Sequence, residues 1–176
     1  SFLADTFSLF ADEGSCSEPS YAKLIVKNKV DVDTLSHSLA KVLESNRISP
    51  SNQDAMTSAI SECVTSQTAC RMIDFSRQVI TFSDEFTNGR KNHVVVEFIT
   101  RKGVNSTRDD QYIYQFTLRQ REDSWIISDH SVEMLSFSRT IRSSLRRAIE
   151  RYDETTLLKR MNSCVERYSK SNCGCE

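Results

Sequence analysis

The sequence predicts an α+β fold in which helices precede and follow a meander of antiparallel strands. Apolar residues recur at helical spacing before residue 65 and again after residue 134, whereas the stretch between them alternates between apolar and polar residues. The chain has 176 residues, which is enough to bury one core and short for two domains. Grouped helices and grouped strands are typical of α+β proteins, because parallel sheets require alternating strands and helices.

The part of the chain before the sheet contains two predicted helices. Residues 1–30 are expected to form an irregular N-terminal segment with a few apolar anchors. Apolar residues at helical spacing then predict a helix over 32–44, with Asp31 or Asp33 as its N-cap. After a proline, the same spacing predicts a second helix over 51–64.

Four strands are predicted in the middle of the chain, over residues 79–82, 93–100, 112–118 and 124–132. Asn88-Gly89 lies between the first two and is a strong hairpin signal. The third strand alternates most regularly. One of its two faces consists of Tyr112, Tyr114, Phe116 and Leu118. Consecutive strands joined by short turns are antiparallel, so we expect a sheet with one face on a core.

Helical spacing returns after the last strand. The apolar face of the next helix consists of Ile141, Leu145, Ala148, Ile149 and Tyr152. Asp153 is placed to cap a further helix. The predicted organisation is one domain over 1–176, with helices and sheet over 31–134 and C-terminal helices with a disulfide-tied tail over 135–176.

The cysteines are the most informative residues of the composition. There are six of them: Cys16, Cys63, Cys70, Cys164, Cys173 and Cys175. An even number favours a framework of three disulfides, and the sequence leaves about 15 pairings open. Because such a framework is rare in the cytosol, we expect a secreted, extracellular protein. A zinc site is the alternative, but the spacing differs from the C-x-x-C pairs of structural zinc sites, so no metal is predicted.

Two weaker features agree with secretion. Asn105-Ser106-Thr107 is an N-glycosylation sequon in a predicted turn, so Asn105 is a candidate glycosylation site. The chain begins at Ser1, as a mature protein would after removal of a signal peptide. The apolar stretches are far shorter than the roughly 20 residues of a membrane-spanning helix, so no transmembrane segment is expected.

The composition argues against several classes of function. A formal net charge of −1 gives no overall attraction to nucleic acid, which we do not expect as a partner. The chain has no glycine-rich phosphate loop, no H-E-x-x-H and no G-x-S-x-G. We therefore expect neither a cofactor nor a nucleophilic serine enzyme.

The segment from Asp110 to Met134 resembles the last two strands of the NTF2-like superfamily. The residues that carry the resemblance are Tyr112, Tyr114, Phe116, Leu118, Trp125, Ile127 and His130. The resemblance implies a curved antiparallel sheet with N-terminal helices in its concave face and a pocket between them. The two additional C-terminal helices and the cysteines indicate a secreted member of the superfamily, of the kind found in animals such as nematodes.

NTF2-like proteins include isomerases, dehydratases and many members that only bind. We therefore expect a non-enzymatic binding module for a small apolar ligand or an extracellular protein, with Tyr112, Tyr114 and Trp125 at the pocket. The alternative is an isomerase or dehydratase, in which Asp129 is the general base and the Tyr114 hydroxyl stabilises an enolate. A purely structural explanation is that the tyrosines are core residues and Asp129 is solvated.

Strict alternation along the last strand also predicts the direction of its polar residues. Asp129 is expected on the strand face of Trp125 and Ile127, and His130 is expected to point away from that face.

An arginine-rich helix face offers a third function. Arg139, Arg142 and Arg146 lie at helical spacing, opposite Ile141 and Leu145. Guanidinium groups suit bidentate contact with carboxylate, sulfate or phosphate, so the chain is alternatively a binder of anionic glycans. A solvated helix face explains the same residues.

Overall fold

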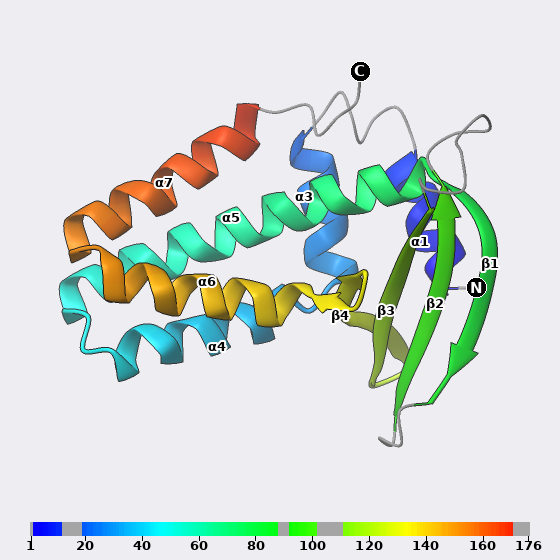
Figure 1. The fold of residues 1–176 in the computed structure, drawn as a ribbon, viewed down its shortest axis with the longest axis horizontal. Coiled ribbons are helices and arrows are strands. Elements are labelled where there is room, and N and C mark those ends of the chain that lie inside the picture. Colours follow the sequence, from blue (N-terminus) through cyan, green and yellow to red (C-terminus); the bar gives the residue numbers. More distant parts are fainter. Residues whose placement is uncertain (1, 12–18, 88–91, 102–110, 171–176) are drawn as a thin grey trace.

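The computed structural model in Figure 1 describes residues 2–11, 19–87, 92–101 and 111–170. Within these residues, helices precede and follow a five-stranded sheet, so the predicted α+β fold class is confirmed. The helices are α1 (Phe2–Ala11), α3 (Pro19–Lys29), α4 (Val32–Ser45), α5 (Pro50–Ser76), α6 (Phe137–Arg151) and α7 (Glu154–Lys170). The strands are β1 (Val79–Phe86), β2 (His93–Arg101), β3 (Gln111–Arg121), β4 (Ser124–Val132) and β5 (Leu135–Ser136).

The strands form one antiparallel sheet in the order β1-β2-β3-β4-β5. The register places Phe98 opposite Tyr114 and Phe116 opposite His130. Because side chains alternate between the two faces, these four residues share the face that packs on the helices. Figure 1 shows the curved sheet at one end of the molecule, with α4, α5, α6 and α7 extending away from it.

A β-bulge decides which side chains of β4 face the core. The β3–β4 register shifts between Thr117 and Leu118, where β4 has one additional residue, Ser128. An additional residue displaces the alternation by one position, so Asp129 lies on the opposite face and His130 is buried in the core. The predicted directions of Asp129 and His130 are therefore wrong, because they assumed unbroken alternation.

Aromatic rings from strands and helices fill the core face of the sheet. The Phe7 ring of α1 lies 4.5 Å from the Phe75 ring of α5 and 5.0 Å from the Phe116 ring of β3, centroid to centroid. Phe75 in turn lies 4.9 Å from Tyr114 and 5.4 Å from Phe98. These tilted contacts contribute attraction beyond the burial of apolar area, so the rings form a tightly packed aromatic cluster.

The expectation that residues 1–30 are irregular is wrong, because α1 and α3 account for the described part of this segment. Leu3, Phe7 and Phe10 lie one helical turn apart and are all buried. Ten residues are too few for a stable isolated helix, so the contacts of α1 with α3 and α5 stabilise it.

Helix α5 is 27 residues long and extends well beyond the predicted end at residue 64. It packs against α1, α3, α4 and α7, and is therefore covered on several sides. A helix covered on several sides has no single apolar stripe, which is why the periodicity of the sequence fades along it.

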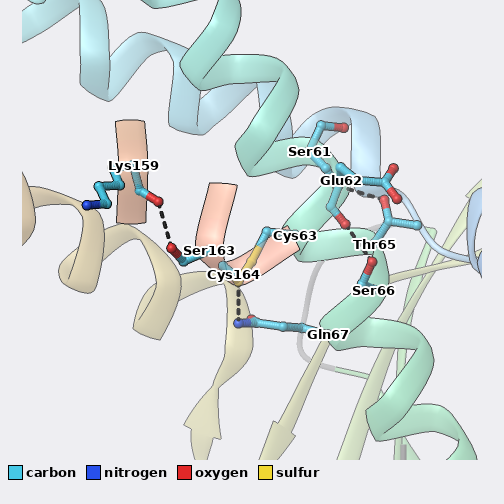
Figure 2. Close-up of a disulfide and its surroundings, with 9 residues drawn as sticks. All are labelled: Ser61, Glu62, Cys63, Thr65, Ser66, Gln67, Lys159, Ser163 and Cys164. Atoms are coloured by element: carbon cyan, nitrogen blue, oxygen red, sulfur yellow. Dashed lines mark hydrogen bonds between the residues drawn. A yellow bond between two sulfur atoms is a disulfide. The ribbon is translucent and has the colours of Figure 1, made fainter. Parts of the chain in front are cut away.

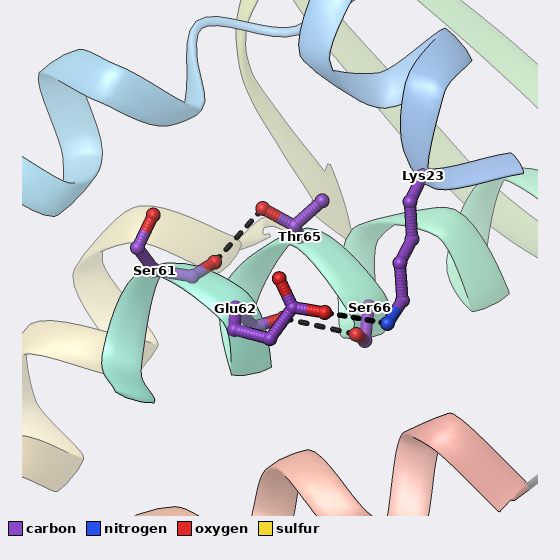
Figure 3. A network of polar contacts seen from close by, with 5 residues as sticks. All are labelled: Lys23, Ser61, Glu62, Thr65 and Ser66. Atoms are coloured by element: carbon purple, nitrogen blue, oxygen red, sulfur yellow. Dashed lines mark hydrogen bonds and ion pairs between the residues drawn. The ribbon is translucent and has the colours of Figure 1, made fainter. Parts of the chain in front are cut away.

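Polar residues of α5 are satisfied within the helix or by α3. The hydroxyls of Thr65 and Ser66 donate to the carbonyls of Ser61 and Glu62, one turn earlier (Figure 3). The Glu62 carboxylate accepts from Lys23 of α3 at 2.5 Å (Figure 3). These bonds allow hydroxyl groups to be buried in the centre of the helical layer.

The start of α4 is fixed to the sheet through Asp31, one of the two predicted caps. Its carboxylate accepts from the Thr34 backbone N–H at 3.3 Å and from the Arg119 guanidinium of β3. The Asp31 backbone N–H donates to the Ile127 carbonyl of β4 at 2.9 Å. Because Asp31 is buried, these partners are needed to satisfy its charge.

Helix α7 is attached at its start to the beginning of α5. The Thr156 N–H donates to Asp153 at 2.9 Å, which confirms the predicted cap. The Glu154 carboxylate accepts from the Ser49 N–H at 2.9 Å and from the Asn52 amide at 2.6 Å. Across the described ranges, no helix has the length and apolarity to cross a membrane.

Candidate functional site

The main candidate site is a cavity of about 380 Å³ inside the helical layer, called here the helix cavity. Helices α4, α5, α6 and α7 all contribute to its walls. The lining residues are Leu39, Ile60, Cys63, Val64, Gln67, Arg71, Phe137, Thr140, Ile141, Ser144, Leu145, Ala148, Leu157, Arg160, Met161 and Cys164. Most of these come from the apolar face of each helix, so the interior of the cavity suits an apolar ligand.

Two arginines at the helix cavity carry its positive charge. The Arg71 guanidinium lies 4.7 Å from the centre of the Phe137 ring, and the Arg160 guanidinium lies 4.1 Å from that of Tyr152. Both arginines are exposed, and neither is paired with a carboxylate among the described residues. A guanidinium lying on an aromatic ring keeps its N–H groups available for an anionic ligand.

A disulfide forms part of the cavity wall. Cys63 of α5 is bonded to Cys164 of α7, with the two Cα atoms 5.8 Å apart (Figure 2). The Gln67 amide donates to the Cys164 sulfur at 3.5 Å, on the same side of α5 (Figure 2). The disulfide therefore holds α7 against α5 at this wall of the cavity. Cys70 is also disulfide-bonded, and Cys16, Cys173 and Cys175 lie outside the described residues.

A polar groove of about 530 Å³ adjoins the helix cavity between α5 and α7, called here the basic groove. Its lining residues are Gln67, Thr156, Lys159, Arg160, Ser163, Cys164, Arg167 and Tyr168. Three of them, Gln67, Arg160 and Cys164, also line the helix cavity. The apolar cavity and the basic groove are therefore adjacent and share part of their walls.

A second apolar hollow, the sheet cleft, lies between α1 and the sheet and measures about 550 Å³. Trp125, one of the predicted binding residues, lines it together with apolar residues of α1 and the strands. Its charged lining residues are Asp84 and Glu85, both acidic. An anionic ligand group is therefore disfavoured in the sheet cleft and favoured at the helix cavity.

The structure does not bring the two predicted catalytic residues together. The Asp129 carboxylate accepts from the hydroxyls of Ser136 and Ser138 at 2.6 and 2.8 Å and from the Ser138 N–H at 3.1 Å. It thus fastens the start of α6 to β4, on the sheet face opposite Tyr114. An Asp129–Tyr114 pair around one substrate is incompatible with this arrangement.

The two predicted tyrosines belong to the sheet core. The Tyr114 hydroxyl accepts from the Gln78 amide at 2.7 Å, and burial raises its pKa. The Gln78 carbonyl oxygen accepts in turn from the Thr100 hydroxyl. Neither Tyr112 nor Tyr114 is among the residues that line the helix cavity or the sheet cleft.

The three predicted arginines lie on the side of α6 turned away from the helix cavity. Arg139 and Arg146 are exposed, and Arg142 is half-buried with its Nε donating to the Ser138 carbonyl at 3.2 Å. They form a solvated helix face, and their binding of an anionic glycan stays a prediction.

His130 marks the boundary between the sheet core and the helix cavity. Its ring stacks on Phe137 with 4.5 Å between centroids, and the Arg71 guanidinium lies 4.7 Å from the centre of the same Phe137 ring. Burial, with a further contribution from Arg71, lowers the pKa of His130 to about 4. The imidazole is therefore neutral at physiological pH, and its Nε2 has no hydrogen-bond partner among the described residues.

Two further expectations concern metal and glycan. The described part of the chain contains no group of three or more His, Cys, Asp or Glu side chains able to hold a metal ion. Asn105 lies outside the described residues, so its glycosylation stays a prediction.

Arg71 and Arg160, together with the cavity itself, are absent from the sequence-based predictions. Each arginine adjoins apolar residues of its helix, which is a weak signal shared by many solvated arginines. The two arginines meet at the cavity because α5 and α7 lie side by side, which no local pattern indicates.

The model of the family described as MlaC protein matches residues 20–163. The chain belongs to the MlaC family. The match includes every lining residue of the helix cavity except Cys164, whereas the α1 residues of the sheet cleft precede it. Among curated proteins, none matches the chain in sequence.

This MlaC-family chain also has a structural neighbour from Ralstonia solanacearum, a phospholipid-binding protein solved in complex with a phospholipid. The two chains are 12% identical with a TM-score of 0.65, and the alignment covers 96% of this chain and 95% of the other. At this identity the likeness shows the shared fold.

The prediction of an animal, nematode-type member is wrong, because the family match is to MlaC, whose fold is NTF2-like. Alternating aromatics followed by Trp125 and Ile127 are a packing pattern that a curved antiparallel sheet requires. Such a pattern indicates the architecture of the sheet and does not distinguish among families.

Proposed function

We propose that this chain is a lipid-binding module in which the helix cavity holds an apolar chain of one lipid molecule. The observation that carries the proposal is the cavity itself, which is apolar inside and bordered by two guanidinium groups that pair with no carboxylate of the described residues. Membership of the MlaC family and the phospholipid bound by the structural neighbour support this class of ligand.

The size of the helix cavity suits such a ligand. Its volume of about 380 Å³ lies at the lower end of the range for small-molecule sites, so we expect one acyl chain rather than two. Each buried methylene contributes about 0.8 kcal/mol, so ten of them contribute roughly 8 kcal/mol before the losses of freedom on binding. Apolar burial is thus the largest favourable contribution that the cavity offers to one chain.

The proposed location is outside the cytoplasm. The Cys63–Cys164 disulfide supports it, because such bonds persist in oxidising compartments. MlaC proteins are periplasmic, which also supports export of this chain. Binding of an extracellular protein partner stays a prediction.

The sheet cleft is the second candidate for the apolar chain. It is larger than the helix cavity and contains Trp125, which is the only tryptophan in the sequence. Its acidic residues, Asp84 and Glu85, oppose a phosphate group at its opening, so we favour the helix cavity.

A phospholipid brominated along its acyl chain tests the proposal, because bromine quenches tryptophan fluorescence only near contact. The delipidated protein is mixed with this lipid, binding is counted by native mass spectrometry, and Trp125 fluorescence is recorded. We expect one lipid per chain with fluorescence nearly unchanged. Strong quenching would place the lipid in the sheet cleft, and the absence of bound lipid would contradict the proposed function.

Two cavity-filling variants provide the matched comparison. Ala148→Phe fills the helix cavity, and Val96→Phe fills the sheet cleft with the same aromatic ring. Each is expected to cost about 1–3 kcal/mol in stability from overpacking. We expect Ala148→Phe to weaken lipid binding at least tenfold and Val96→Phe to leave it within about twofold.

A further inference from the structure

We infer that the basic groove is a headgroup site that gives the protein a preference for anionic over zwitterionic phospholipids. The inference rests on the proposed function, since the lipid chain would occupy the helix cavity. It goes further in assigning the headgroup to named residues and in predicting a selectivity by charge.

The first argument is continuity. Gln67, Arg160 and Cys164 line both the helix cavity and the basic groove, so a single molecule can extend from one into the other. An amphiphile placed in this way has its chain among apolar residues and its head among polar residues. Figure 2 shows this junction, with Gln67 and the disulfide between α5 and α7 and with Lys159 and Ser163 on α7.

The second argument is charge. Lys159, Arg160 and Arg167 line the groove, and none of the described residues in its lining is acidic. None of the three is ion-paired among the described residues. Glu154, the acidic residue at the start of α7, is already bonded to Ser49 and Asn52, which lower its pKa. Three cations on one side of a groove favour an anion over a headgroup that carries its own ammonium.

The third argument is the orientation of Arg160. Its guanidinium lies 4.1 Å from the centre of the Tyr152 ring, which restricts the side chain at the junction of groove and cavity. A planar guanidinium held by one face still presents its edge, and that edge matches two oxygens of a phosphate. Tyr152 comes from the end of α6, so the α6–α7 turn positions this contact.

The other hollows of the described chain lack this combination. The described lining of the sheet cleft has two acidic and no basic residues. A shallow pocket near the start of α4 mixes Asp31 and Asp33 with Arg119 and Arg121. The basic groove is therefore the part of the described surface where an apolar cavity continues into an uncompensated positive charge.

The test is a competition between phosphatidylglycerol and phosphatidylcholine with identical chains, presented in equal amounts to the delipidated protein. Native mass spectrometry gives the ratio of the two bound lipids. We expect about tenfold more phosphatidylglycerol, which corresponds to one net charge-assisted contact. A ratio near one with full occupancy would overturn the headgroup inference and leave the proposed function intact. No lipid of either kind would overturn both.

A matched pair of double variants separates the groove from general electrostatics. Lys159→Gln with Arg167→Gln removes two charges from the basic groove, and Arg139→Gln with Arg146→Gln removes two from the far side of α6. All four side chains are exposed, so neither pair should disturb folding. The groove pair is expected to lower the ratio to about one while total occupancy is kept, and the α6 pair should leave it unchanged. Equal effects of the two pairs would overturn the inference.

A free anion such as inorganic phosphate is the alternative ligand of the basic groove, because it has the same phosphate group as a lipid. Inorganic phosphate at millimolar concentration is expected to leave the bound phosphatidylglycerol in place, because phosphate lacks the chain that the helix cavity holds. Displacement of the lipid by phosphate alone would assign the groove to a free anion and contradict the headgroup site.

Discussion

The sheet half and the helical half of this protein are stabilised in different ways. Rings of Phe7, Phe75, Phe98 and Phe116 fill the sheet half, with neighbouring centroids as close as 4.5 Å. In the helical half the disulfide between α5 and α7 and the bonds of Glu154 hold the helices around a cavity of about 380 Å³. A packed aromatic cluster and a cavity with cross-linked walls therefore coexist in one chain.

The largest expected effect tests how tightly the sheet half is filled. Phe75→Ala removes a ring that touches Phe7, Phe98, Tyr114 and Phe116, and we expect a loss of about 3–5 kcal/mol in the free energy of unfolding. Urea denaturation followed by circular dichroism measures it. A loss below about 1 kcal/mol would mean that this core is loosely packed.

The next effect concerns the tether of the helical half. Replacing both Cys63 and Cys164 by serine opens a link between residues 101 positions apart, and we expect a loss of about 3 kcal/mol. Lipid occupancy should also fall, because α7 forms one wall of the cavity. Ser163→Ala, next to the disulfide on an exposed position of α7, is the control and should change stability by less than about 0.5 kcal/mol. Unchanged lipid occupancy in the double variant would show that the tether does not maintain the cavity.

The free energy of unfolding should depend on pH through His130, which lies at the boundary between the two halves. The pKa of His130 is lowered to about 4 in the folded state, against an ordinary value of 6.5, so the unfolded chain binds more protons between these values. The contribution of neutral His130 to the free energy of unfolding is therefore fully present above about pH 6.5. It is lost as the pH falls toward 4, and the loss at pH 4.5 is about 2–3 kcal/mol.

His130→Phe is the variant that isolates the pH-dependent contribution of His130 to stability. The ring can keep the stacking on Phe116 and Phe137 without a titratable group. Thermal unfolding of both proteins between pH 4.5 and 7 is the measurement, and the difference in their unfolding free energies should change across this window. A constant difference would show that His130 does not titrate there.

The smallest expected effect is a truncation beside the cavity. Leu145→Ala should cost about 2 kcal/mol, at the low end for such a change, because one side of Leu145 already faces the open helix cavity. The enlarged cavity should also accept a longer acyl chain, which a chain-length series in native mass spectrometry would detect. A cost near 5 kcal/mol would mean that this part of the cavity is collapsed in solution.

Several elements were predictable from local pattern. The sequence predicts 124–132 for the last strand and 32–44 for the first long helix, and the structure has β4 at Ser124–Val132 and α4 at Val32–Ser45. Both segments have one buried face, so burial and periodicity agree. Helix α5 was predicted too short because its burial on several sides erases that agreement.

The candidate site was less predictable than the fold. Trp125 does line a hollow, but Asp129 and Tyr114 are on opposite faces of the sheet. A single bulged residue, Ser128, is responsible for the direction of Asp129, and nothing in the composition of the strand indicates it. The arginines at the helix cavity were missed because their role depends on helices far apart in sequence.

The sequence by itself determined the order of helices and strands, the antiparallel sheet and the even set of cysteines. These follow from the period of apolar residues and from composition, which are local properties of the chain. Tertiary structure alone decided that four helices enclose a cavity and that Arg160 joins it to a basic groove. A cavity is the volume that packing leaves unfilled, and the same apolar side chains line a filled core and an open one.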